Sequence, residues 1–160
     1  MSLKFDAACE QSFTDLTKTN SNWILWEVEN KEVKVTGSGS GGLAELVSQF
    51  QEDKVYFGCL KVLAVDDREN TKSIRTKIVS FSFIGNKVPV LKKANAGPQR
   101  NEVFAKFKGT AGSIDVNDAK DFTSVAIKDL LLRSGGAHKP TRYEFGDGTI
   151  ESIDAFHGKA

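Results

Sequence analysis

The chain has 160 residues, of which 39% are hydrophobic and 27% are charged, and its formal net charge is +1. This composition is ordinary for one globular domain with a single core. No stretch approaches the roughly 20 apolar residues that cross a bilayer, and charged residues interrupt the first segment, so we expect neither a membrane span nor a signal peptide. We expect a soluble protein with one domain over residues 1–136 and a partly mobile C-terminal tail over residues 137–160.

The near-neutral total hides an uneven distribution of charge. Residues 72–108 hold nine Lys and Arg residues against one acid, Glu102, which gives a net charge of +8. The rest of the chain holds 13 basic and 20 acidic residues, a net charge of −7. Because a one-signed field steers partners of opposite sign and has no role in folding, we expect this segment to bind a polyanion or an acidic protein surface.

The first third of the chain predicts two helices with a hairpin between them. Apolar side chains recur at helical spacing from Phe5 to Leu16 and again from Leu43 to Phe50. The segment between them alternates apolar and polar residues, as strands do. The elements expected are a helix over 3–17, strands over 23–28 and 33–35 around a tight turn at 29–31, and a short helix over 43–50.

The next part of the chain predicts the centre of a sheet. Residues 55–65 are apolar on both faces, which indicates a strand covered on both sides. A polar turn at 66–70 and a strand over 75–84 are expected to follow, with Val79, Phe81 and Phe83 on one face of that strand. Residues 88–108 have broken periodicity, and a short helix is expected there only from about Pro98, because proline fits the first turn of a helix. A strand at 114–116 and a helix capped by Asn117 are expected to close the domain.

The cysteines and histidines indicate no chemistry of their own. Cys9 and Cys59 belong to no CxxC or Cys/His cluster, so we expect buried free thiols and a reducing compartment, most simply the cytoplasm. His138 and His157 lack a second ligand at a metal-like spacing and are expected at the surface. We therefore expect no metal site.

Residues 37–42 read GSGSGG and match the GxGxxG pattern of dinucleotide-binding proteins. In such proteins the glycine amides bind a pyrophosphate, and an acid after the next strand, here Asp66 or Asp67, binds the ribose. Here, however, the preceding strand is the half-exposed arm of a hairpin, and the following helix is short for a crossover. We expect a flexible connection, with a nucleotide-binding enzyme that uses residues 37–42 as the less favoured alternative.

Other signatures of catalysis are missing from the sequence. It contains neither GxxxxGK[ST] nor GxSxG. No acid is paired with a histidine or lysine in an apolar context that would shift its pKa. We therefore expect no enzymatic activity and no cofactor.

Several stretches carry a resemblance to a known family: residues 39–46 (GSGGLAEL), 66–67 (DD) with 72–77 (KSIRTK), 83–94 (FIGNKVPVLKKA) and 133–138 (RSGGAH). Together with the order of the elements, they resemble the actin-depolymerising factor homology (ADF-H) domain, and within that family its coactosin members. The resemblance implies an α/β (α+β) fold, in which a central mixed sheet of five to six strands lies between helices on both faces. It also implies a cytoplasmic protein of the cytoskeleton that binds actin filaments without catalysis.

The resemblance further implies which residues contact actin. The filament site of coactosin-like members is similar to the basic pair Arg75 and Lys77, and a later basic segment matches a filament-facing helix of actin-depolymerising factors. Because Gly97 and Pro98 are expected to interrupt that helix, we expect weak or no binding of monomeric actin. The net charge of residues 72–108 is consistent with this site, since actin presents an acidic surface that would attract a basic segment. The residues expected to bind actin are Lys72, Arg75, Lys77, Lys92, Lys93 and Arg100.

The favoured function is therefore that of a monomeric actin-filament-binding protein that occupies filament sides through a basic surface and modulates actin dynamics. The alternative is a module that binds another polyanion, either phosphoinositide headgroups or nucleic acid. Binding of single-stranded RNA on a sheet needs exposed aromatic side chains, whereas Phe81 and Phe83 are expected in the core. We therefore expect no specific binding of nucleic acid.

Overall fold

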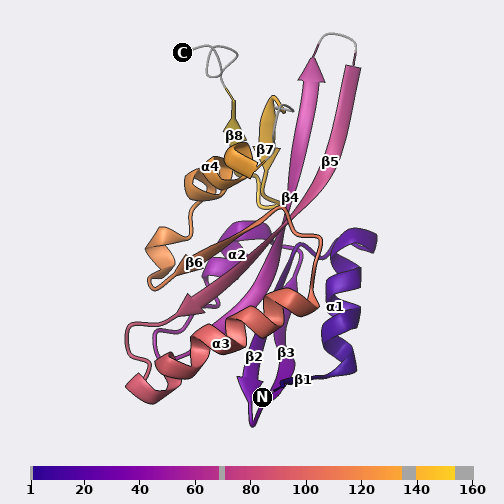
Figure 1. Ribbon diagram of the computed structural model, residues 1–160. Helices are drawn as coiled ribbons and strands as arrows, with labels where there is room; N and C mark the ends of the chain where they lie inside the picture. The colour runs from indigo at the N-terminus through magenta and orange to yellow at the C-terminus, as the bar shows by residue number, and fades with distance from the viewer. Residues whose placement is uncertain (1, 69–70, 135–139, 154–160) are drawn as a thin grey trace.

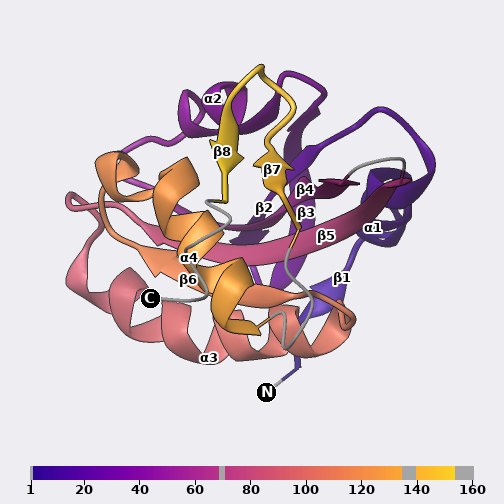
Figure 2. The ribbon, with the colours of Figure 1, turned by 90° about the horizontal axis from the view of Figure 1, so that it is seen from above.

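The computed structural model describes residues 2–68, 71–134 and 140–153. A mixed β-sheet carries helices on both faces (Figure 1, Figure 2), which confirms the predicted α/β (α+β) class. His138 and His157 lie outside the described residues. The elements in chain order are β1 (Lys4–Phe5), α1 (Ala7–Lys18), β2 (Trp23–Glu29), β3 (Glu32–Gly39), α2 (Gly42–Val47), β4 (Val55–Arg68), β5 (Thr71–Ile84), α3 (Val90–Lys106), β6 (Gly112–Val116), a 3-10 helix (Ala119–Asp121), α4 (Ser124–Ser134), β7 (Arg142–Glu144) and β8 (Ile150–Ser152).

The sheet is built around the pairing of β4 with β5. Its strand order is β1-β3-β2-β4-β5-β6, with β7 on the free edge of β4 and β8 on β7. The described residues thus form an eight-stranded sheet, in which β7 and β8 add two strands to the five to six predicted. The β1–β3 and β5–β6 pairs are parallel, and the other pairs are antiparallel. The β4–β5 ladder runs unbroken from the Val55–Ile84 pair to the Arg68–Thr71 pair.

The far end of this ladder projects from the body of the molecule (Figure 1). β2 borders β4 only along residues 57–60, and β7 borders it only along residues 63–65. We call the projecting pairs, residues 66–68 with 71–73, together with the adjoining β5 residues 74–77, the arm. The prediction of a turn beginning at residue 66 is wrong, because residues 66–68 continue β4 opposite residues 71–73 of β5.

Each face of the sheet has its own apolar core. On one face α2 and α4 cover a cluster that includes Leu60, Phe81 and Phe83, as predicted for these two phenylalanines. On the other face α1 and α3 cover a cluster that includes Trp26 and Phe57. Cys9 and Cys59 are buried free thiols in this second core, which confirms that prediction. Burial raises the pKa of the Cys9 thiol to about 11, so it stays protonated at neutral pH.

α3 runs through Gly97 and Pro98 without a break, so the predicted interruption is wrong. Both residues lie on the exposed side of the helix. The opposite side buries Ala96 and Val103, and Phe107 at the end of the helix stacks on Trp26 with 4.3 Å between ring centroids. This packing outweighs the roughly 3 kcal/mol that a proline costs inside a helix.

Capping residues correct two other predicted helix boundaries. α1 begins after Asp6, whose carboxylate accepts a hydrogen bond at 3.0 Å from the amide two residues on, so the residues before it are free to form β1. Asn117 caps no helix. Asp118 caps the 3-10 helix, and Thr123 accepts a hydrogen bond from the Ala126 amide at 3.1 Å at the start of α4.

β7 and β8 form a hairpin that packs against the start of α2. Tyr143 and Phe145 are buried in the core beneath α2 and α4. The Phe145 carbonyl accepts a hydrogen bond from the Leu43 amide at 3.1 Å. The division of the chain at residue 136 and the mobility of its end stay predictions, and residues 154–160 lie outside the described part.

We expect Phe145→Ala to lower the free energy of unfolding by about 3–5 kcal/mol, because truncating a fully buried phenylalanine leaves a cavity. Urea denaturation of both proteins measures the change. Ile150→Ala in the same hairpin is the control: its side chain is 51% exposed, so the change should stay within about 0.5 kcal/mol. A Phe145→Ala variant as stable as the wild type would mean that the hairpin is not docked in solution.

Candidate functional site

The three predicted site residues of β5 lie on two sides of the arm. Arg75 and Lys77 alternate with Thr76 along the strand, so both face the side on which Val79 is buried. Lys72 faces the other side. Lys72 and Arg75 are exposed, and Lys77 is half-buried opposite Val62 of β4. The structure thus brings Arg75 and Lys77 together and places Lys72 across the ribbon from them.

The acids beside these cations are already paired. Asp66 contacts Arg68 at 3.0 Å, and Asp67 contacts Arg142 of β7 at 3.4 Å. Within the described residues, by contrast, none of the cations Lys72, Arg75 and Lys77 forms an ion pair. We call these three the arm patch. Its positive charge faces solvent and remains available to a partner.

A second basic surface lies at the start of α3. Lys92 and Lys93 are exposed there and pair with no acid among the residues that the structure describes. Beside them the side chains of Val90 and Leu91 are 83% and 76% exposed. We call these four residues the α3 patch. A large exposed apolar pair beside cations is typical of a protein-binding surface.

Sequence reasoning missed Val90 and Leu91, although a signal for them exists. Ala96, Val103 and Phe107 recur at the spacing of one helix face. One helical turn before Ala96, the same face of the helix falls at residues 92–93. Val90 and Leu91 therefore lie on other sides of the helix. An apolar pair off the buried face is then expected to meet solvent or a partner.

Arg100 differs from the other five predicted residues because its charge is paired within the molecule, although its side chain is 29% exposed. Its guanidinium donates to both carboxylate oxygens of Asp115 on β6, from Nε at 2.6 Å and from Nη2 at 3.0 Å. It also lies over the Phe104 ring, 4.4 Å from the centroid. Arg100 therefore joins α3 to the sheet, and we do not count it with either patch.

The two patches lie at opposite ends of β5 (Figure 1). Arg75 stands near the start of the strand, and Ile84 ends it just before the turn into α3. Nine residue-to-residue steps of extended chain separate these two positions, a distance of about 30 Å. The six predicted site residues thus form one patch on the arm, part of a second patch on α3, and one internal ion pair.

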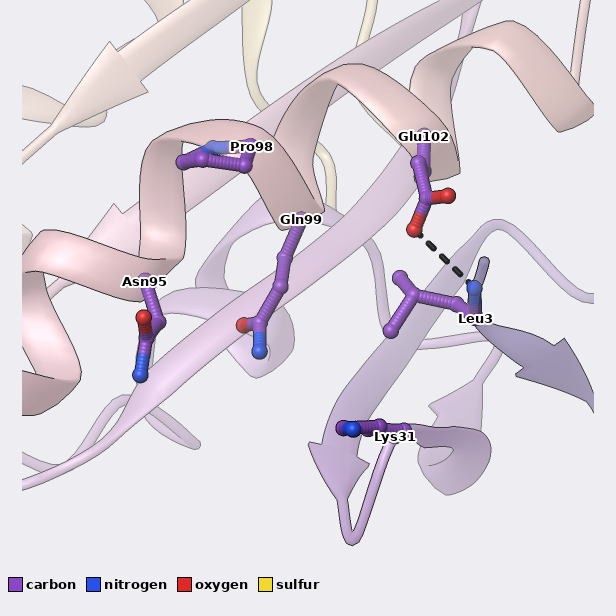
Figure 3. A pocket seen from close by; sticks show the side chains of 6 residues that line it. All are labelled: Leu3, Lys31, Asn95, Pro98, Gln99 and Glu102. Carbon is purple, nitrogen blue, oxygen red and sulfur yellow. Dashed lines mark hydrogen bonds between the residues drawn. The ribbon is translucent and has the colours of Figure 1, made fainter. Parts of the chain in front are cut away.

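A pocket of about 560 Å³ lies between α3 and the β2–β3 turn (Figure 3). The Leu3 amide at its edge donates a hydrogen bond to Glu102 at 3.0 Å, so the one acid of the basic segment fastens the N-terminal strand to α3. In the described residues around it, the pocket pairs no nucleophile with a base. Its lining consists of Leu3, Lys31, Asn95, Pro98, Gln99 and Glu102.

The glycine-rich segment is a strand rather than the predicted flexible connection over its first half. Residues 37–39 belong to β3 and pair with β2. The Trp23 indole crosses this strand and donates to Glu45 of α2 at 2.7 Å. A Cβ atom on Gly39 would lie 2.8 Å from that indole nitrogen. Gly39 is therefore required by packing.

The amides at the start of α2 are not available to a phosphate. Glu45 and Asp147 also place two carboxylates there, which would repel one. This geometry removes the basis of the nucleotide-binding alternative. The amides and their acceptors are Gly41 with Glu45 at 3.0 Å, Gly42 with Asn22 at 2.8 Å, Leu43 with Phe145 at 3.1 Å and Ala44 with Asp147 at 2.8 Å.

Other kinds of site find no support in the part of the chain that the structure describes. No group of three His, Cys, Asp or Glu side chains there could hold a metal ion. Phe81 and Phe83 are buried, so they offer no platform for stacking bases. None of the helices in this part is long and apolar enough to span a membrane.

The fold, a mixed sheet with helices on both faces, is that of an ADF-H domain, a class of actin-binding protein. The chain matches the model of the cofilin/tropomyosin-type actin-binding protein family over residues 2–132. Coactosin of Dictyostelium discoideum is 30% identical over 138 residues, which cover 85% of this chain and 90% of that protein. The chain therefore belongs to the cofilin/ADF family of actin-binding proteins, as its sequence predicted.

Solved structures share the fold. The crystal structure of coactosin from Entamoeba histolytica has a TM-score of 0.71 at 16% identity and covers 85% of this chain and 99% of that one. The solution structure of mouse coactosin, an actin filament binding protein, has a TM-score of 0.69 at 20% identity and covers 86% of this chain and 95% of that one.

The Arg100–Asp115 pair predicts a pH dependence. Partial burial works to raise the pKa of Asp115, but hydrogen bonds from Arg100 and Ser82 and the charge of Arg100 lower it below its ordinary value. The pair therefore stabilises the fold above about pH 4, the unfolded pKa, and this contribution is lost as pH falls through the lower folded pKa.

We expect Arg100→Gln to raise the pKa of Asp115, as followed by NMR titration of the side-chain carboxyl. Lys120→Gln is the control, because its side chain is 87% exposed beside a different acid, Asp118. An Asp115 pKa that is equal in the wild type and in Arg100→Gln would show that the pair does not form in solution.

Proposed function

We propose that this protein binds the sides of actin filaments through the arm patch and the α3 patch together, and modulates filament dynamics without catalysing a reaction. The observation that carries the proposal is the pair of exposed patches, each with unpaired cations, at opposite ends of β5. Family membership supplies the partner, actin. Cations that face an acidic surface speed the association of the two proteins and fix their relative orientation in the complex.

Two separated patches favour a filament over a monomer. A filament repeats the same subunit surface along its length, so the arm patch can contact one subunit while the α3 patch contacts a neighbour. The second contact is then intramolecular and gains from effective concentration. A single actin monomer offers no neighbouring subunit. This geometry supports weak binding of monomeric actin as part of the proposal. An interrupted helix no longer supports it, because α3 is continuous.

The proposal also covers the effect on filament dynamics, the compartment and the oligomeric state. A protein that occupies filament sides alters the access of other proteins to them, which is modulation without chemistry. Mouse coactosin, which shares the fold, is an actin filament binding protein. The buried free thiols Cys9 and Cys59 suit the reducing cytoplasm, where the actin cytoskeleton lies. We propose that the protein acts there as a monomer.

We expect Arg75→Glu and Lys77→Glu each to weaken filament binding at least about tenfold, because each puts a like charge against an acidic partner. High-speed co-sedimentation with filamentous actin measures the affinity, and binding of the wild type should weaken as salt is added. Lys120→Glu makes the same change of charge away from both patches and should bind as the wild type does. If Arg75→Glu and Lys120→Glu lose affinity equally, only net charge matters and the arm patch is not the site.

The α3 patch gives a separate expectation. Replacing Val90 and Leu91 together by serine should weaken co-sedimentation about tenfold through lost apolar contact at the interface. The free energy of unfolding should change little, because both side chains are exposed. The matched control replaces Val125 and Ile150, exposed by 52% and 51%, with serine. Equal binding by the Val90/Leu91 variant and the wild type would exclude the α3 patch from the interface.

A further inference from the structure

The C-terminal hairpin lies where the arm leaves the body, and it follows the last residue that the family model matches. The family model ends at residue 132, whereas β7 and β8 span residues 142–152. β7 pairs with β4 at residues 63–65, directly before the arm begins. The hairpin is therefore placed where it can affect the arm patch.

Thr141 ties the backbone of the hairpin to the base of the arm. Its amide donates to the Val65 carbonyl at 2.8 Å. Its hydroxyl donates to the same carbonyl at 3.0 Å and accepts a hydrogen bond from the Asp67 amide at 3.0 Å. A two-stranded ribbon is marginally stable in water, and an added strand stabilises it. The hairpin thus supports the first residues of the arm from one edge.

Arg142 forms an ion pair with Asp67, the acid that lies opposite Lys72. Asp67 and Lys72 stand directly opposite each other in the β4–β5 register, a spacing at which opposite charges attract. Asp67 nevertheless contacts Arg142, at 3.4 Å. Glu144 fixes the other side of the guanidinium through a hydrogen bond of 2.7 Å. Asp67 is therefore held by the hairpin, and Lys72 is left free.

We propose that the β7–β8 hairpin is a positioning element for the actin-binding arm: Thr141 holds its backbone and Arg142 keeps Asp67 away from Lys72. The electrostatic half, in which Arg142 keeps Asp67 away from Lys72, rests on the proposed function, since Lys72 is a cation assigned to filament binding. The mechanical half, in which Thr141 holds the backbone of the arm, is a property of the free protein. The two halves can therefore be tested separately.

Amide hydrogen exchange of the free protein tests the mechanical half. Thr141→Val keeps the shape of the side chain and its backbone bond but removes the hydroxyl. Exchange at Asp67 and at residues 71–76 should quicken about fivefold to tenfold, the equivalent of one or two weak hydrogen bonds. Thr123→Val, which removes the cap of α4, is the control and should leave exchange in the arm unchanged. Unchanged exchange in Thr141→Val would overturn the support of the arm by the hairpin.

A double-mutant cycle of Arg142→Gln and Asp67→Asn tests the electrostatic half by filament co-sedimentation. Arg142→Gln alone should weaken binding about threefold to tenfold, because Asp67 then pairs with Lys72. Adding Asp67→Asn should restore most of this loss, whereas Asp67→Asn in the wild type should change binding less than twofold. An equal gain from Asp67→Asn in both backgrounds would contradict this role of Arg142. If the wild type does not bind filaments at all, the proposed function fails, and the exchange experiment still decides the mechanical half.

Discussion

The unbroken pairing of β4 with β5 is the constraint on which the rest of the structure depends. Its inner half supplies apolar side chains to both cores, so α1 and α3 can pack on one face and α2 and α4 on the other. Its outer half leaves the body as the arm. Because β5 also leads directly into α3, the length of this one ladder sets the separation of the two exposed patches.

The distribution of ion pairs explains how a nearly neutral chain presents a basic surface. Acids in or near the basic segment already interact within the molecule. Glu102 accepts a hydrogen bond from the N-terminal segment, Asp115 forms an ion pair with Arg100, and Asp67 forms one with Arg142. The cations of the arm patch, Lys72, Arg75 and Lys77, and those at the start of α3 form no such ion pairs among the described residues. A partner with an acidic surface can therefore bind them without first breaking internal ion pairs.

Local pattern predicted the elements whose signal is contained in a few neighbouring residues. The apolar run at 55–65 indicated a strand buried on both faces, and the position of Phe81 and Phe83 followed from alternation. The first half of α3 was missed because Gly97 and Pro98 oppose a helix locally, and a short helix was expected only from about Pro98. The packing of Phe107 on Trp26, which favours the whole helix, joins distant parts of the chain. The same limit applies to the site: the charge pattern indicated Arg75 and Lys77, but only the fold shows that Arg100 is ion-paired with Asp115.

Electron cryomicroscopy of actin filaments decorated with the protein tests the central claim most directly, because it shows which surfaces touch which subunits. We expect the arm patch to lie on one actin subunit and the α3 patch to lie on a neighbouring subunit. A decorated filament in which either patch faces solvent, or in which both patches contact a single subunit, would contradict it.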